Sequence, residues 1–291
     1  MSDGLRFGHV RFGASLVITP NRKVYLIDGG YIGTGASCLL AWLRAYANIN
    51  PFRVDGMFLT HYHENHSGGL LDVVRSLAPL DRVGPLYSSG VLSECSYENP
   101  CKYARDTQVQ DWLIAGLAKH GIPHHHLKMG DKVDLGGGVV MDALGPREDY
   151  LPASMTTDDP DDRTGLSLRF TYGQSTLIHL GDQFLEDVLN IAADHENPKA
   201  TVLVAPHHGG PTYIDNDVLA AFDPDFVVLD SHSNGATTEA WLTGKSILSW
   251  RLTHGDPNAS TLDLCVRSDG TVSAMNAPSV PELSVARGVV L

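Results

Sequence analysis

The feature that most constrains this chain is a run of three histidines placed directly after a strand-like segment. Residues 54–59 predict a strand, and the sequence HYHENH follows at residues 61–66. Residues 70–77 then predict a helix, after a short Ser-Gly-Gly segment. His61 and His63 stand two residues apart, so in an extended segment their side chains point the same way and can reach one metal ion.

Polar side chains also follow other strand-like segments. Asp28 follows VYLI, Asp182 follows LIHLG, and His207 and His208 follow VLVAP. Because ligands of open α/β sheets bind at the carboxyl ends of the strands, we expect these groups to meet in one site. Imidazole with carboxylate is a ligand set of zinc, manganese and iron. His66 lies one turn beyond the first two histidines and is predicted to face a second ion.

The composition predicts one globular domain over residues 1–291. Hydrophobic residues make up 43% of the chain, and no Pro-, Gly- or Ser-rich linker divides it. The formal net charge is −13, which disfavours binding to long nucleic acids. We therefore expect a small-molecule substrate.

Three further observations bear on location. No segment approaches the ~18 consecutive apolar residues of a membrane span, so we expect no membrane contact. The N-terminal residues lack the continuous apolar stretch of a secretory signal. The four cysteines are scattered without a CxxC motif, which fits a reducing compartment. These observations favour a cytoplasmic protein.

Strand and helix patterns alternate as in α/β proteins. A β-hairpin is predicted over residues 14–28. In the last third, strands are predicted at 166–170, 175–180, 201–205 and 226–230, with helices at 184–193 and 216–222. Residues 145–165 predict a long acidic loop. A second histidine run, residues 124–126, has no acidic partner nearby in the sequence, so we interpret it as separate from the metal site.

The motifs resemble those of a known family. Residues 59–70 (LTHYHENHSGGL) look like the HxHxDH signature of the metallo-β-lactamase superfamily. Residues 177–182 (LIHLGD) resemble its bridging-aspartate motif, and residues 204–210 (VAPHHGG) resemble its late-histidine motif. The PHHG form is similar to the hydrolase domain of ComEC-like DNA-uptake competence proteins. The resemblance covers residues 7–275.

This resemblance implies a four-layer αββα sandwich with two divalent metal ions, zinc or manganese, between the sheets. It also makes a homodimer an expectation. The residues carried over are His61 and His63 for the first ion, His66 and His207 for the second, and Asp182 as the bridge between them. His207 is favoured over His208 because the first histidine of the PHHG pair is the usual ligand. His208 is then expected to contact substrate.

The sequence departs from the family pattern at two places. Asn65 replaces the aspartate of HxHxDH, and an amide oxygen can ligate but carries no charge. This weakens the second metal position, so a single ion is the alternative. The third histidine of the first ion is missing, and residues 159–164 (DPDDRT) occupy its place. Asp162 is the candidate substitute, and a solvated acidic loop is the alternative.

The function implied is that of a metal-dependent hydrolase that uses a metal-activated water. The PHHG form favours a phosphodiester or small nucleotide as substrate. Asp182, His208 and His232 are the candidate catalytic residues, with the two histidines, or His254, as proton donors to the leaving group. Asp28 is a candidate supporting residue. Two alternatives remain open: a lactone, thioester or β-lactam hydrolase on the same fold, and a degenerate member that binds a metal or a partner protein.

Overall fold

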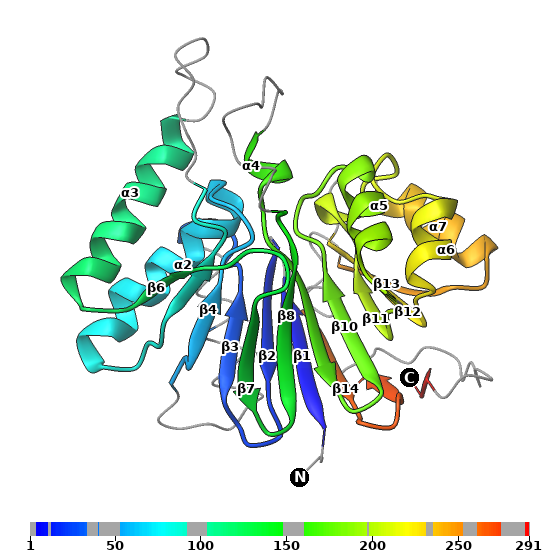
Figure 1. Ribbon diagram of the computed structural model, residues 1–291, viewed down its shortest axis with the longest axis horizontal. Coiled ribbons are helices and arrows are strands. Elements are labelled where there is room, and N and C mark those ends of the chain that lie inside the picture. Colours follow the sequence, from blue (N-terminus) through cyan, green and yellow to red (C-terminus); the bar gives the residue numbers. More distant parts are fainter. Residues whose placement is uncertain are drawn as a thin grey trace.

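The fold consists of two mixed β-sheets that face each other, with helices on both outer faces (Figure 1). The computed structural model describes residues 4–10, 13–33, 40, 53–91, 104–147, 160–196, 198–230, 235–252, 261–274 and 289–290. The order of layers is helix, sheet, sheet, helix. The predicted four-layer αββα sandwich is therefore confirmed, and it is the metallo-β-lactamase type of α/β fold.

The first sheet has the order β16-β15-β14-β1-β2-β3-β4-β5-β6 within the described residues. Its strands are β1 (Leu5–Val10), β2 (Ala14–Ile18), β3 (Val24–Ile27), β4 (Gly56–Phe58), β5 (Leu86–Ser88), β6 (His124–His126), β14 (Thr261–Val266), β15 (Val272–Ala274) and β16 (Val289–Val290). Strands β3 to β6 run parallel. The predicted hairpin is β2 and β3, and β1 pairs with its outer side.

The second sheet has the order β13-β12-β11-β10-β9-β8-β7. Its strands are β7 (Lys132–Gly136), β8 (Val139–Gly145), β9 (Ser167–Tyr172), β10 (Ser175–His179), β11 (Val202–Val204), β12 (Phe226–Asp230) and β13 (Leu248–Leu252). Strands β10 to β13 run parallel. The strand and helix order predicted for the last third is confirmed.

The longer helices flank the sheets and pack apolar side chains against them. The helices are α2 (Glu64–Leu77), α3 (Ala104–Lys119), α4 (Pro160–Arg163), α5 (Leu185–Asp194), α6 (Asn216–Phe222) and α7 (Gly235–Gly244), with 3-10 turns η1 (Ala78–Leu80) and η4 (His207–Gly209). Helices α2 and α3 pack on the first sheet, and α5, α6 and α7 pack on the second. None of the helices that the structure describes has the length and apolar character to cross a membrane.

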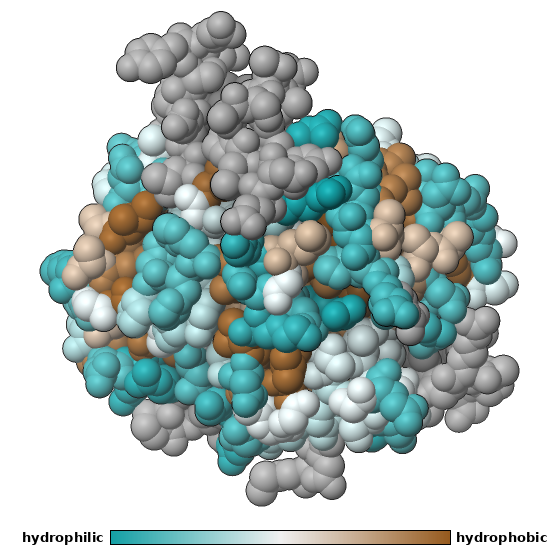
Figure 2. All heavy atoms as spheres, viewed as in Figure 1, coloured by the Kyte–Doolittle hydropathy of each residue, from teal (hydrophilic) through white to brown (hydrophobic). Residues whose placement is uncertain are grey.

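Side-chain alternation divides the apolar residues among three cores. In β1, Phe7 faces the space between the sheets, whereas Val10 faces the helical layer. Phe58 and Phe170 come from opposite sheets and meet edge to face in the central core. On the face shown in Figure 2, hydrophilic side chains are interspersed with smaller hydrophobic patches. The burial of apolar side chains on both sides of each sheet holds the strand ends in place for the site.

Helix α2 begins earlier than the sequence pattern predicts. It starts at Glu64 rather than near Leu70, so that it contains His66 and the Gly-Gly pair. A Cβ on Gly68 would lie 2.5 Å from the backbone nitrogen of Ile32, which shows how closely α2 approaches the segment after β3. The glycines therefore serve close backbone contact inside a helix rather than a turn before it.

The same close approach gives a stability prediction at Gly29, which follows β3. A Cβ on Gly29 would lie 2.2 Å from the Leu70 nitrogen, and the Gly29 N–H donates to the His66 carbonyl. We expect Gly29→Ala to lower the free energy of unfolding by about 1–3 kcal/mol, as overpacking commonly does. Gly244→Ala is the matched control, because nothing lies within 4 Å of the position of its Cβ. Urea unfolding measures both, and equal stabilities would contradict the predicted contact.

Candidate metal centre

One group of candidate metal ligands combines two histidines from the loop after β4 with an aspartate from helix α4. His61 and His63 point the same way, as predicted, with 3.0 Å between His61 Nε2 and His63 Nδ1. Both nitrogens lie 3.4 Å from Asp162 Oδ1. Asp162 is only 2% exposed, so it is not part of a solvated acidic loop. Two imidazoles and a carboxylate thus form a compact group with the spacing of metal ligands.

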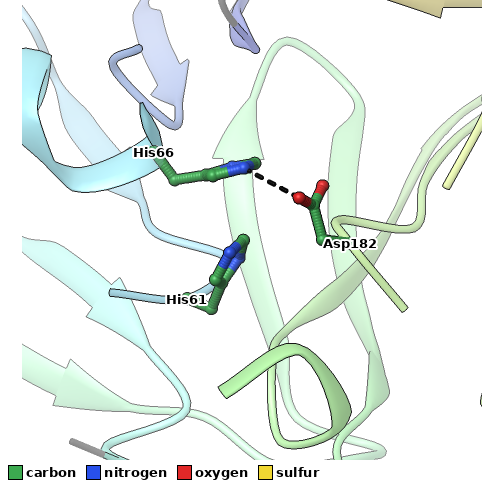
Figure 3. A group of neighbouring side chains, drawn as sticks. All are labelled: His61, His66 and Asp182. Carbon is green, nitrogen blue, oxygen red and sulfur yellow. Dashed lines mark hydrogen bonds and ion pairs between the residues drawn. The ribbon is translucent and has the colours of Figure 1, made fainter. Parts of the chain in front are cut away.

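A second group shares His61 and crosses between the sheets (Figure 3). His66 comes from the first turn of α2, and Asp182 follows β10 of the opposite sheet. His66 Nε2 lies 3.2 Å from Asp182 Oδ2. In each group the ligand atoms lie within 4.8 Å of one another. The sequence-based expectation that strand exits converge is therefore met for these residues.

His208 also faces Asp182. Its Nε2 lies 3.3 Å from Asp182 Oδ2 and 3.1 Å from Asn65 Nδ2. Gly13, in the β1–β2 turn, closes over this place, since a Cβ there would lie 3.3 Å from the His208 ring. The structure therefore brings Asn65, His66, Asp182 and His208 together.

His207, the histidine that the family resemblance favours as a ligand, does not face Asp182 Oδ2 as His208 does. His207 Nδ1 is 3.2 Å from the backbone oxygen of Asp182 and 3.7 Å from Asp162 Oδ2. Its ring stacks on Tyr213 at 4.0 Å and is 30% exposed. The reason is local: φ is 48° at His207 and 58° at His208, two successive left-handed residues that send the rings in different directions.

Three of the imidazoles are fixed by a partner on Nδ1. His61 Nδ1 lies 3.0 Å from Thr60 Oγ1, and that hydroxyl donates to Asp28. His66 Nδ1 lies 2.8 Å from Asp28 Oδ2. His208 Nδ1 lies 3.2 Å from Asp230 Oδ2 in the same way.

These partners decide which nitrogen can bind a ligand. With the Thr60 hydrogen directed to Asp28, the Thr60 oxygen accepts from His61 Nδ1–H, which leaves the Nε2 lone pair of His61 facing the site. Metal-ligating histidines almost always donate their other ring N–H to such a partner. The residues present thus have the donor atoms, orientation and support that a divalent transition-metal ion requires.

The electrostatics show how the buried charges balance one another. Burial and the neighbouring histidines hold the pKa of His61 well below its ordinary value, so this ring is neutral. Burial opposes the charge on His66, but Asp182 and Asp28 outweigh it and raise the pKa of His66 to about 10. Asp182 and Asp230 likewise raise the pKa of His208 against the effect of burial. Two imidazolium groups therefore neutralise buried carboxylates in the metal-free protein.

Two sequence-predicted candidates cannot be placed relative to the site, and two supporting residues were not predicted. His232 and His254 lie outside the described residues. Sequence reasoning did not find Thr60 or Asp230. Asp230 had a signal, since it ends an apolar strand as Asp28 and Asp182 follow theirs. Thr60 had none, because its role depends on the direction of a single hydroxyl.

Comparisons with known proteins bear on the family and the fold. The metallo-β-lactamase superfamily model matches residues 9–87, which include the HYHENH run. Mutant CmlA β-hydroxylase matches with a TM-score of 0.57 and 12% identity over 90% of this chain, which spans 54% of the CmlA chain. A candidate metal-dependent hydrolase from Parabacteroides distasonis matches with a TM-score of 0.51 and 13% identity, over 85% of this chain and 92% of the other.

The family match covers the part of the chain that holds the HYHENH run, and the two structural neighbours show the same fold. At these identities the structural matches establish the fold and nothing more. Among curated proteins, none matches the chain by sequence.

The raised pKa of His66 predicts a pH dependence of stability in chelator-treated protein. A group whose pKa is raised on folding contributes stability that is fully present below its ordinary pKa of 6.5, and this stability is lost as the pH rises through about 10. We expect wild-type protein to lose more stability than His66→Gln between about pH 7 and pH 10. Urea unfolding at both pH values measures this difference. His125→Gln, at an exposed position, should follow the wild type, and equal losses in all three proteins would contradict the assignment.

Proposed function

We propose that this chain is a metal-dependent hydrolase that cleaves phosphodiester bonds in small soluble molecules such as nucleotides. The observation that carries the proposal is the set of three imidazoles, His61, His66 and His208, each supported on Nδ1 and turned by Nε2 toward one buried group of carboxylates. A merely structural cluster of buried histidines does not require all of them to share this orientation.

Two divalent ions, zinc or manganese, are proposed to bind here. His61, His63 and Asp162 would hold the first, while His66, His208 and the amide oxygen of Asn65 would hold the second, with Asp182 between them. When bound, such ions lower the pKa of a coordinated water toward about 7 and polarise the scissile ester. The neutral Asn65 makes the second position the weaker one, so the number of bound ions can be one at low metal concentration.

The chain's own residues would orient the reacting groups. Asp28, Asp230 and Thr60 keep each imidazole in one tautomer and one orientation. His207 stands beside the cluster, held by its stacking on Tyr213 and partly exposed, where it can donate a hydrogen bond to a phosphoryl oxygen of the substrate. His232 is the proposed proton donor to the leaving group. His208, the other candidate proton donor from the sequence, is proposed here as a metal ligand instead.

The substrate class rests on two observations. The PHHG segment resembles that of the ComEC-like competence proteins, which favours a phosphodiester. The net charge of −13 disfavours a long polyanion and favours a small one that a local pair of cations can neutralise. We propose that the protein acts in the cytoplasm on such a substrate.

The fold alone does not choose the reaction, because one fold supports many chemistries. The CmlA neighbour is named a β-hydroxylase and the Parabacteroides neighbour is named a hydrolase. A test of the proposal must therefore include substrates other than phosphodiesters. A lactone and a thioester represent the other hydrolytic classes.

We expect bis(p-nitrophenyl) phosphate to be hydrolysed in the presence of Mn²⁺ or Zn²⁺. His61→Ala should lower kcat/KM by more than about 100-fold, since even outer-shell partners of metal ligands commonly contribute 10–100-fold. His125→Ala, at an exposed position on β6, should retain full activity. Release of p-nitrophenolate measures the rate.

The outcomes separate the candidate functions. Turnover of the lactone or thioester alone would replace the phosphodiesterase proposal with another hydrolase. Metal binding without turnover of any substrate would indicate a member that binds metal or a partner protein. Turnover that His61→Ala leaves unchanged would place the reaction outside this site.

Asn65→Asp tests the weaker metal position separately. The carboxylate would add a negative charge beside His208, 3.1 Å from the present amide, and charged oxygen binds divalent cations better than neutral oxygen. We expect metal content after dialysis to rise toward two ions per chain, with a higher rate at limiting metal. Mass spectrometry of metals measures the occupancy. An unchanged occupancy would mean that Asn65 is not a ligand.

A further inference from the structure

The second histidine run forms the edge strand β6 and lies outside the candidate metal centre. β6 pairs with β5 at one end of the first sheet. Side chains alternate along a strand, so His124 and His126 share one face and His125 takes the other. His125 stacks on Tyr87 at 5.2 Å, whereas the rings of His124 and His126 approach each other.

The His124–His126 pair has the same ring arrangement as the His61–His63 pair. The ring centroids of His124 and His126 are 4.7 Å apart with an interplanar angle of 79°. The corresponding values for His61 and His63 are 4.6 Å and 81°. Both pairs have one residue between the two histidines. The two pairs therefore share the separation and tilt of their rings.

His124 also has a hydroxyl partner on one ring nitrogen, as His61 does. His124 Nε2 lies 2.8 Å from Ser88 Oγ and 3.4 Å from the Tyr62 hydroxyl. In the tautomer whose Nε2–H donates to one of these hydroxyls, Nδ1 carries the lone pair that a metal ion needs. His126 is exposed, and its ring lies against Gly90, where a Cβ would be 2.6 Å from the ring atoms. These contacts restrict the orientation of both rings.

We propose that His124 and His126 form a second metal site, at the edge of the sheet, for late first-row divalent ions such as Zn²⁺, Ni²⁺ and Cu²⁺. Imidazole nitrogen suits these ions, whereas Mg²⁺ and Ca²⁺ prefer oxygen. Two protein ligands leave the rest of the coordination sphere to solvent. The site is therefore weaker and more readily exchanged than the candidate centre, and it does not depend on the proposed function.

Calorimetric titration of the full chain with Zn²⁺ alone tests the proposal. We expect wild-type protein to bind one more weakly held Zn²⁺ per chain, here called the weaker class, than the one or two ions of the candidate metal centre. His124→Ala/His126→Ala should lose the weaker class. His125→Ala is the matched control and should keep it, because its ring faces the other side of the strand.

A second pair of variants keeps the result interpretable. His126→Gln alone should also lose the weaker class, and it leaves the Ser88 and Tyr62 contacts of His124 in place. His61→Ala/His63→Ala should lose tight binding and retain the weaker class, so the two proposals fail separately. Absence of a weaker class in wild type, its survival in His124→Ala/His126→Ala, or its loss in His125→Ala would overturn the edge-strand site.

Discussion

Buried carboxylates that face imidazoles are the interaction on which this structure depends. Asp28, Asp182 and Asp230 lie at strand ends of both sheets and are at most 8% exposed. An isolated buried carboxylate costs several kcal/mol, so each must be paired or coordinate a cation. His66 lies between Asp28 and Asp182, and His208 lies between Asp182 and Asp230. The resulting alternation of acid and imidazole spans the space between the sheets.

This alternation explains why the backbone around the site is unusual. Gly13, Gly181 and Gly209 have positive φ, and His207 and His208 adopt left-handed conformations that side chains rarely take. Such strain costs about 1–3 kcal/mol per residue and persists only where surrounding contacts over-determine it. Here those contacts are the paired charges, together with the hydrogen bond from the His207 N–H to the Gly181 carbonyl. The turn conformation is therefore a consequence of bringing His208 to Asp182.

Much of this arrangement could be predicted from the sequence. The parts that could not be predicted share one physical reason. Apolar strands that are followed by Asp28, His61 or Asp182 identify the sheet edge, because polar groups are costly inside a strand and tolerated beyond its end. Asp162 could be predicted only from the family pattern, because it lies where the third histidine of the first ion is missing. Neither the early start of helix α2 nor the different positions of the His207 and His208 rings could be predicted from the sequence, because both depend on backbone contacts between segments distant in the chain.

The two His-X-His pairs on the first sheet show what spacing alone determines. His61 and His63 lie in the loop after β4 and His124 and His126 lie in β6, yet both pairs have the same ring separation and tilt, so this arrangement follows from the local spacing. What differs is the surroundings: Asp162 lies 3.4 Å from His61 and His63, whereas hydroxyl groups are the polar partners that contact His124. Carboxylates add negative charge and bridging oxygens, which a hydrolytic metal centre requires and an exchangeable edge site does not. The convergence of the two sheets, rather than the histidine spacing, is therefore what makes one pair a candidate for catalysis.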